Sequence, residues 1–331
     1  MLGKHHVVVE SSGLKYSFEI RRNITIIQGD SATGKTTLTE MLAAYRRLGP
    51  GQGITVSSDV PVYVYIGEDA EWKYNLEKIT GSLVFIDEDY RFYYTREFAE
   101  YLPTTDNYYI FITRKPIYEL PYSTNEIYGI RTSGKYHFPE QIYHEFYPIY
   151  PALWDSSEQA GMEGHKKELL ILIEDKESGY QFFQNVAGNN RCISSEGNSN
   201  LYRKMLETDS ENGLLVIADG AALGPYIDML VKITKLDAHI ALYFPESFEW
   251  MILKSGILRD ADIDEILSHP EKYIDSREYI SWERFFTALL REKTKDDPVK
   301  RYEKKELSAF YTGENAKQIL QVMPEEIRTL L

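Results

Sequence analysis

One eight-residue stretch, Gly29–Thr36, constrains this chain more than any other part of its sequence. It reads Gly-Asp-Ser-Ala-Thr-Gly-Lys-Thr and follows the apolar run ITIIQ, which is typical of a buried strand. After it, KTTLTEMLAAYRRLG places apolar residues at helical spacing and ends at a glycine. Glycines at these positions let successive backbone N–H groups point into one concavity, beside the positive end of the following helix. The stretch therefore predicts a strand, an anion-binding loop and a helix.

Phosphate chemistry gives each residue type in this loop a role. We expect Lys35 to reach the β- and γ-phosphates of a nucleotide as a point charge, and the Thr36 hydroxyl to ligate Mg²⁺. The expected ligands are ATP and Mg²⁺, although the loop reads phosphate only and leaves the base open. The predicted nucleotide-binding residues are Gly29, Asp30, Ser31, Ala32, Thr33, Gly34, Lys35, Thr36 and Thr37. Lys35 is also assigned to catalysis.

A second element consists of four apolar residues, Leu83 to Ile86, followed by the acids Asp87 and Glu88. It resembles the Walker B motif of P-loop NTPases. The resemblance implies that Asp87 holds Mg²⁺ through water and that Glu88 polarises the attacking water. The alternative is an ordinary solvated strand end, which an acidic pair by itself does not exclude.

The glutamate after the Walker B aspartate resembles the additional-strand, catalytic-glutamate group of P-loop proteins, which includes AAA+, STAND and ABC ATPases. Thr113 ends the next predicted strand, where that group carries a polar sensor residue. Arg114 follows it, and we expect its guanidinium group to stabilise the negative charge of the phosphates, either within the same chain or from a neighbouring protomer. An exposed strand end is the alternative for both. The resemblance covers roughly residues 5–150 and looks most like ABC-type ATPases, but no LSGGQ-like signature lies between the two motifs.

The order of the predicted elements indicates an α/β fold with two such units. Strands alternate with helices through residues 1–150, which predicts a P-loop NTPase domain with a mainly parallel sheet. Residues 150–166 are rich in Pro, Gly, Ser and charge, and we place a boundary there. Residues 166–245 contain four further apolar runs and predict a second α/β domain, and residues 246–331 predict a helical extension. The four runs are ELLILIE, NRCISSE, GLLVIAD and HIALYFP.

The second domain resembles, more faintly, the TOPRIM fold found beside ATPase domains in OLD-like and other phage-defence proteins. That resemblance implies a metal site at Glu174, which ends the first strand, and at Asp219, which ends a later one. The second acid of the family's Asp-x-Asp pattern is Ala221 here. We therefore expect one ion at most and a weak or inactive nuclease, with a Rossmann-like module without metal as the alternative. Replacement ligands are available at Asp175, Glu177 and Asp228.

Composition limits the partners. The formal net charge of −14 excludes a broad basic nucleic-acid surface as the dominant feature and leaves a local groove open. No apolar run is long enough for a signal peptide or a membrane span, so we expect a cytoplasmic protein with no membrane partner. Cys192 is the single cysteine and cannot form an intramolecular disulfide. A protein partner or a homo-oligomer remains open.

These features leave a few functions. The first is a MgATP-dependent ATPase whose nucleotide cycle controls the attached C-terminal module, in phage defence or nucleic-acid processing. The alternatives are a P-loop phosphotransferase acting on a small molecule, an ATP-gated TOPRIM nuclease, and a nucleotide switch that does not hydrolyse. A kinase of this kind needs an acid- or Arg-rich lid between the two motifs, and residues 48–80 contain no Arg.

Overall fold

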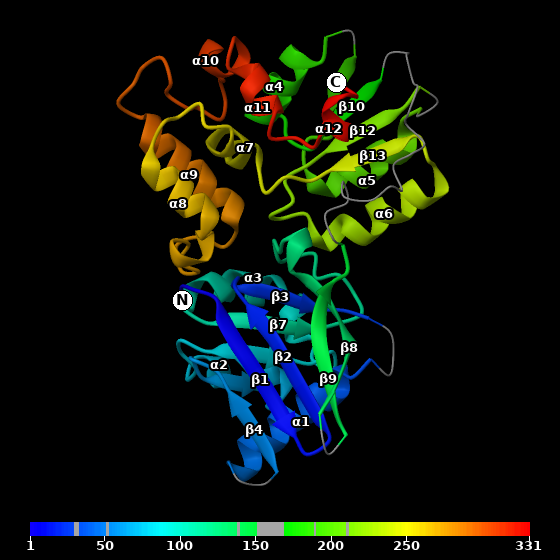
Figure 1. Cartoon of the computed structure of the whole chain (residues 1–331), viewed down its shortest axis with the longest axis vertical. Coiled ribbons are helices and arrows are strands. Elements are labelled where there is room, and N and C mark those ends of the chain that lie inside the picture. Colours follow the sequence, from blue (N-terminus) through cyan, green and yellow to red (C-terminus); the bar gives the residue numbers. More distant parts are fainter. Residues whose placement is uncertain (30–32, 51–52, 138–139, 151–168, 189, 210–211) are drawn as a thin grey trace. The chain divides into compact units, whose positions relative to one another are not determined.

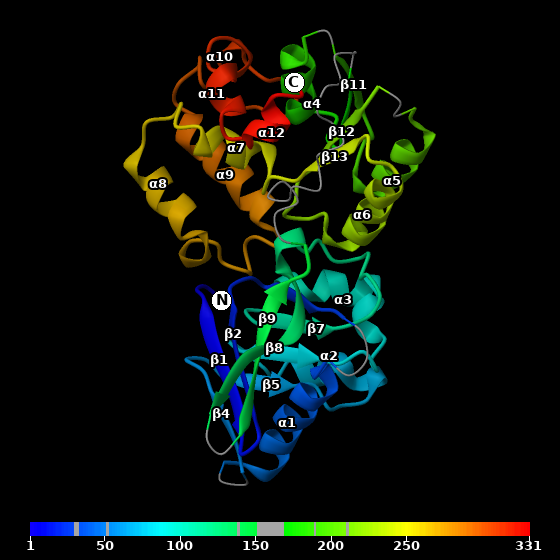
Figure 2. The ribbon, with the colours of Figure 1, turned by 45° about the vertical axis from the view of Figure 1, so that its right-hand side comes forward.

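The computed structural model describes residues 1–29, 33–50, 53–137, 140–150, 169–188, 190–209 and 212–331 (Figures 1 and 2). Contacts divide the chain into two compact units. Unit 1 comprises Met1–Tyr122, Glu126–Tyr150 and His269–Ile280, and unit 2 comprises Ser123–Asn125, Pro151–Ser268 and Ser281–Leu331. The boundary predicted at residues 150–166 lies almost wholly outside the described residues.

Unit 1 contains a sheet that, in the described residues, has nine strands in the order β4-β1-β2-β9-β8-β3-β7-β6-β5. The strands are β1 (His5–Ser11), β2 (Leu14–Ile20), β3 (Ile24–Ile27), β4 (Ile54–Ser57), β5 (Val62–Val64), β6 (Leu83–Ile86), β7 (Tyr108–Ile112), β8 (Ile127–His137) and β9 (Gln141–Pro148). The helices are α1 (Lys35–Leu48), α2 (Trp72–Leu76) and α3 (Arg96–Tyr101).

The pairing in this sheet is mostly parallel. On one side of the sheet the neighbouring strands are all parallel, in the spatial order β8, β3, β7, β6 and β5. On the other side, β2 pairs parallel with β9. β3, β6 and β7 are buried along their whole length, as expected for strands covered on both faces. β1 and β2 form an antiparallel hairpin, in which buried and more exposed residues alternate. The antiparallel pair β8 and β9 and the edge strand β4 are not anticipated by the sequence argument.

The helix after the loop packs one face onto this sheet. α1 contacts β4 and β5 (Figure 2) and buries Leu38, Met41 and Leu42, which follow each other at helical spacing. Each such side chain contributes about 1.5–3 kcal/mol relative to an exposed one. α1 ends at Gly49, whose φ of 76° lies in the left-handed region, and its N–H donates to the Tyr45 carbonyl over 2.9 Å. This packing fixes the direction of the loop that precedes the helix.

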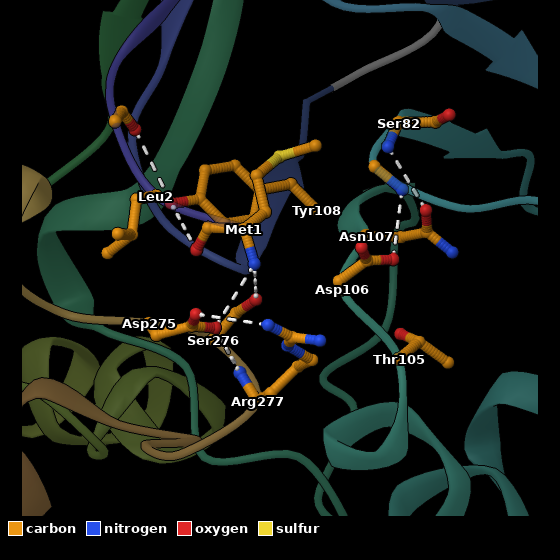
Figure 3. Close-up of polar contacts among 12 residues, drawn as sticks. Met1, Leu2, Ser82, Thr105, Asp106, Asn107, Tyr108, Asp275, Ser276 and Arg277 are labelled. Carbon is orange, nitrogen blue, oxygen red and sulfur yellow. Dashed lines mark hydrogen bonds and ion pairs between the residues drawn. The ribbon is translucent and has the colours of Figure 1, made fainter.

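Residues 269–280 belong to unit 1, although they lie in sequence between two helices of unit 2. Gly3 N–H donates to the Glu271 carbonyl over 2.7 Å, and the Asn23 side chain donates to the Ile280 carbonyl over 2.9 Å. Figure 3 shows Met1 with its amino group facing Asp275, at 3.2 Å from Oδ1. The predicted extension over residues 246–331 is thus divided between the two units.

Unit 2 contains a four-stranded sheet in the order β11-β10-β12-β13, and all of its described pairings are parallel. The strands are β10 (Leu170–Ile173), β11 (Arg191–Ser194), β12 (Leu214–Ile217) and β13 (Ile240–Tyr243), which confirms the four predicted runs. The helices are α4 (Ser178–Val186), α5 (Asn198–Glu207), α6 (Ile227–Leu236), α7 (Phe248–Lys254), α8 (Ala261–Ser268), α9 (Trp282–Thr294), α10 (Ala309–Thr312), α11 (Ala316–Leu320) and α12 (Glu325–Arg328).

The structure therefore confirms a mixed α/β chain with a large, mostly parallel sheet, a second parallel sheet and helices toward the C-terminus. Within its described part, none of the helices has the length and apolar character needed to cross a bilayer.

Candidate functional site

The loop between β3 and α1 is described at both ends, while Asp30, Ser31 and Ala32 lie outside the described residues. Gly34 stands at the N-cap of α1 with a φ of 94°, a conformation that L side chains rarely adopt. A Cβ at this position would stand 3.0 Å from the Tyr16 phenol oxygen. Tyr16 donates to the Gly34 carbonyl over 3.0 Å. Gly34 is thus required by both the backbone conformation and the close approach of a side chain.

Lys35 is buried and its ammonium group folds back over the loop. Nζ donates to the Gly29 carbonyl over 2.6 Å and to the Thr33 hydroxyl over 3.0 Å. Both acceptor oxygens belong to residues of the loop, so the Lys35 ammonium group connects Gly29 with Thr33. Thr36 is exposed in the first turn of α1, next to Lys35.

A stacked pair of rings supports the loop from the sheet, and the sequence argument does not foresee it. Tyr16 on β2 and His144 on β9 are register partners, and their ring centroids lie 4.8 Å apart. Burial raises the pKa of Tyr16 to about 12, against a hydrogen bond with Thr37, and burial lowers the pKa of His144. Both rings are therefore neutral near pH 7. No spacing in the sequence links positions so far apart.

Asp87 lies just beyond the end of β6 and is held by a residue of α1. The Thr39 hydroxyl donates to Asp87 Oδ2 over 2.7 Å and also lies 3.0 Å from the Thr36 carbonyl. Asp87 Oδ1 accepts the Glu88 N–H over 2.6 Å. Thr39 is buried, one helical turn after Thr36. Thr36 and Asp87 are predicted from the sequence and Thr39 is not, although its position one turn after Thr36 on the same helix face is a usable signal.

Glu88 and Arg114, both predicted as catalytic, contact each other directly. Arg114 Nε donates to Glu88 Oε2 over 2.9 Å, and Nη2 lies 2.9 Å from Oε1. Thr113, the predicted sensor residue, is buried. Its hydroxyl donates to the Lys115 carbonyl over 2.8 Å and lies 2.6 Å from the Tyr94 hydroxyl. Thr113 therefore orders the turn after β7.

The loop, the acidic pair and Arg114 follow the carboxyl ends of three neighbouring strands. β3, β7 and β6 are parallel neighbours, so the loop after β3 and the acids after β6 emerge on the same side. The register pairs Ile27 with Ile112 and Ile86 with Phe111. The end of β7, which carries Arg114, therefore stands between the loop and the acidic pair. This edge of unit 1 is the candidate nucleotide site.

Unit 2 carries a second group of acids, which includes both predicted ligands. Glu174 follows β10 and Asp219 follows β12, and the register of these neighbouring strands pairs Ile173 with Ile217. Burial raises the pKa of Glu174 to about 7, with a contribution from the Glu283 charge. Burial, and then the Glu283 charge, also raises the pKa of Asp219, whose Oδ1 accepts the Phe248 N–H over 3.1 Å.

Two further carboxylates and one cation complete this acidic cluster, which we define as Glu174, Asp219, Glu249, Glu283 and Lys304. Lys304 Nζ lies 3.2 Å from Glu283 Oε1 and 3.9 Å from Glu249 Oε1. Burial alone lowers the pKa of Lys304, but the Glu249 and Glu283 charges outweigh it and raise that pKa. Glu249 is buried, and its Oε2 accepts no hydrogen bond from the part of the chain that the structure describes.

Two of the three replacement ligands suggested by sequence, Asp175 and Asp228, make other contacts. Asp175 accepts the N–H groups of Glu177 and Gly179, over 2.9 and 2.8 Å, and so caps the start of α4. Asp228 lies on the surface of α6 and pairs with Lys232 at 2.6 Å. Ala221 is itself buried. The additional acids come instead from α7 and α9, far along the chain.

A small cavity lies beside two residues of the cluster, Glu174 and Asp219. This cavity of about 10 Å³, room for about one water molecule, is lined by Glu174, Asp175, Asp219 and apolar side chains. Among the residues that the structure describes, no three carboxylate, imidazole or thiolate groups are gathered closely enough to hold a metal ion. The metal site expected from the sequence involves only the two acids Glu174 and Asp219, and it stays a prediction.

Comparison with known proteins adds no assignment to this geometry. No protein-family model matches the sequence, and no match is found among curated proteins.

Proposed function

We propose that unit 1 binds MgATP and hydrolyses it at the sheet edge formed by the ends of β3, β6 and β7. One observation carries the proposal: the Gly29–Thr36 loop with Lys35 lies at the same edge as the carboxylates Asp87 and Glu88, which are fixed by Thr39 and Arg114. A phosphate-binding loop, a metal ligand and a base are the parts that phosphoryl transfer to water requires.

The strand order supports the same class of ATPase. β7 lies between β3, which precedes the loop, and β6, which precedes the acids. An extra strand at this place is the feature for which the additional-strand group is named. The glutamate directly after Asp87 fits the second half of that description. The order of the strands and the acids at the end of β6 therefore both support the additional-strand, catalytic-glutamate group.

Lys35 and the loop backbone would hold the phosphates. The Lys35 ammonium group now donates to two oxygens of the loop, and a phosphate entering the loop would offer it charged acceptors in their place. Because Lys35 is buried, this charge is little screened by water. The N-terminal end of α1 adds its partial positive charge at the same point.

The residues present also fit a Mg²⁺ ion. Thr36 offers a hydroxyl and Asp87 a carboxylate, which are the hard oxygen ligands that this ion prefers. Thr39 connects them, because its hydroxyl lies within hydrogen-bond distance of both Asp87 and the Thr36 carbonyl. Bound Mg²⁺ would neutralise the charge that develops on the phosphate oxygens. Glu88, the acid next to it, is the side chain assigned to take the proton from the attacking water.

The test is to measure MgATP binding by calorimetry and phosphate release by the purified full chain. We expect both activities in the wild type and loss of most ATP affinity in Lys35→Ala, with Arg46→Ala as a control on a cation of the same helix. Unchanged affinity in a folded Lys35→Ala variant would show that the loop is not the site. Binding without any turnover would favour the passive nucleotide switch.

The small-molecule kinase is less well supported. A cavity of about 430 Å³ is lined by Arg46, Tyr63, Tyr65, Asn75 and Lys78, in part from the segment between the two motifs. Arg46 stands about 16 Å along α1 from Lys35, since an α-helix rises about 1.5 Å per residue. An acceptor in that cavity would lie too far from the γ-phosphate for direct transfer, which requires contact of the reacting atoms.

A second candidate function concerns unit 2, which we propose as the output module of the ATPase. The observation that favours divalent-ion-dependent phosphodiester cleavage is the convergence of Glu249 and Glu283 on Glu174 and Asp219, with Lys304 among them. Two-metal cleavage needs several carboxylates around the ions. These acids would have to move closer together to hold an ion. The proposed role in phage defence or nucleic-acid processing depends on phosphodiester cleavage by unit 2.

A further inference from the structure

The ion pair between Glu88 and Arg114 occupies both oxygens of the carboxylate. The two contacts, each 2.9 Å, form a bidentate pair in which a planar guanidinium group faces a planar carboxylate. A general base has to accept a proton from water that lies within hydrogen-bond reach. In this arrangement the lone pairs of Glu88 that face Arg114 already accept hydrogen bonds from its guanidinium group, and so do not face a water molecule.

The sheet places Arg114 where a nucleotide would compete for it. Arg114 follows β7, and β7 lies between the strand that leads into the loop and the strand that leads into Glu88. Its side chain is 57% exposed and that of Glu88 is 29% exposed, so the pair is accessible from solvent. Guanidinium groups bind phosphate with the same bidentate geometry as carboxylate.

We propose that this ion pair is a lock on the general base, and that the γ-phosphate of bound ATP opens it by taking Arg114 away from Glu88. The inference rests on the proposed ATPase function and adds the regulation of its site. Without a γ-phosphate, Glu88 stays paired and water is not activated. With ATP in the loop, Arg114 binds the phosphate and Glu88 is released toward the water.

The strength of the pair suits such an exchange. Solvent-exposed ion pairs stabilise a protein by an amount that corresponds to about a two- to fivefold change in an equilibrium constant. A bound nucleotide can outweigh this amount. A fully buried pair would cost far more to separate and would not open on each cycle.

The experiment is a double-mutant cycle on binding, made with the full chain and the non-hydrolysable analogue AMP-PNP with Mg²⁺. Dissociation constants are measured for the wild type, Glu88→Gln, Arg114→Met and the double variant. If binding separates the pair, the product of the wild-type and double-variant constants exceeds the product of the two single-variant constants by about two- to fivefold. With MgADP, which lacks the γ-phosphate, we expect the two products to be equal.

Matched controls keep the outcomes separate. Replacing Arg114→Met in the cycle by Lys115→Met, which removes the next exposed cation, should give equal products with both nucleotides. Equal products for AMP-PNP with Arg114→Met, or the same excess with MgADP, would overturn the lock while leaving the ATPase proposal intact. If wild type binds neither nucleotide, or if Lys35→Ala binds both as well as wild type, the ATPase proposal and the lock fall together.

Discussion

The hydroxyl of Thr39 donates a hydrogen bond to the carboxylate of Asp87 over 2.7 Å. Thr39 belongs to α1, which follows the Gly29–Thr36 loop. Asp87 follows β6, which is separated in the sheet from β3 by one strand, β7. The bond therefore joins the two halves of the candidate nucleotide site before any ligand arrives. A carboxylate held in this way has already lost part of its conformational freedom, which would favour its binding to an ion.

We expect Thr39→Val to weaken the Mg²⁺-dependent part of ATP binding by about tenfold or more. The substitution keeps the shape of the side chain but removes a hydrogen bond to a charged group, which is worth about 1.5–3 kcal/mol. Calorimetry with MgATP and with ATP plus EDTA separates the metal-dependent part from the rest. Thr39→Ser, which keeps the hydroxyl, should bind like wild type. Equal MgATP affinity in Thr39→Val would mean that the bond does not position Asp87.

Glu88→Gln and Asp87→Asn should affect different steps. Glu88→Gln should keep MgATP bound while phosphate release falls by about 10²- to 10⁴-fold, the range attributed to a positioned general base. Asp87→Asn should instead weaken binding only when Mg²⁺ is present. The readouts are single-turnover phosphate release and calorimetry. A Glu88→Gln variant that hydrolyses at the wild-type rate would remove Glu88 from the mechanism.

The sequence predicts this fold where a local pattern decides the structure. The buried runs of β3, β6 and β7 and the four strands of unit 2 are continuous and apolar, and the glycines of the loop have a specific backbone role. Glu88 and Arg114 are both found from strand ends, because parallel neighbours bring such ends to one edge. The contact between them is set by register, which a single sequence does not reveal.

What the sequence does not predict depends on residues far apart in the chain. Glu249 and Lys304 join the acidic cluster through the packing of helices, and the stacking of His144 on Tyr16 follows from the register of β2 and β9. Residues 269–280 join unit 1 through backbone hydrogen bonds that carry no sequence pattern. These features follow from tertiary packing, which overrides local propensity.

Unit 2 should lose stability as pH rises through the range in which Glu174 ionises. Burial raises the pKa of Glu174 from 4.5 to about 7, so the folded state favours the protonated carboxyl group. The free energy of unfolding is therefore highest below about pH 4.5 and decreases as pH rises toward 7. The loss is on the order of 3 kcal/mol. Urea unfolding of wild type and Glu174→Gln at pH 5 and pH 8 checks this. Glu174→Gln should be the more stable at pH 8 and gain nothing at pH 5; equal stabilities at pH 8 would contradict the shift.

Lys304→Met should destabilise unit 2 at neutral pH by about 3 kcal/mol. The substitution leaves Glu249, which is buried, and Glu283 without the nearby cation, and unpaired buried charge is costly. Thermal and urea unfolding measure the change. Lys305→Met alters the next residue, which is exposed, and should stay within about 0.5 kcal/mol of wild type. If both variants unfold alike, Lys304 does not compensate the cluster.

Unit 2 has features that count both for and against cleavage of nucleic acid. The formal net charge of −14 counts against a nuclease, and so does the buried Ala221, which stands where the TOPRIM pattern has an aspartate. Glu249 and Glu283 supply carboxylates that could take the place of that aspartate. Titratable groups with raised pKa values, such as Glu174 and Asp219, are concentrated at functional sites.

We therefore expect any cutting of DNA or RNA by the full chain to be weak, to require Mg²⁺ or Mn²⁺, and to respond to ATP. The assay incubates the purified protein with single- and double-stranded substrates, with each ion and with EDTA, in the presence and absence of ATP. Glu174→Gln and Glu249→Gln should abolish cutting, because each removes a carboxylate from the cluster. Asp228→Asn, which changes an acid on the surface of α6, should cut like wild type. No cleavage of any substrate would leave unit 2 as an interaction module whose acids stay neutralised by Lys304 and by protonation.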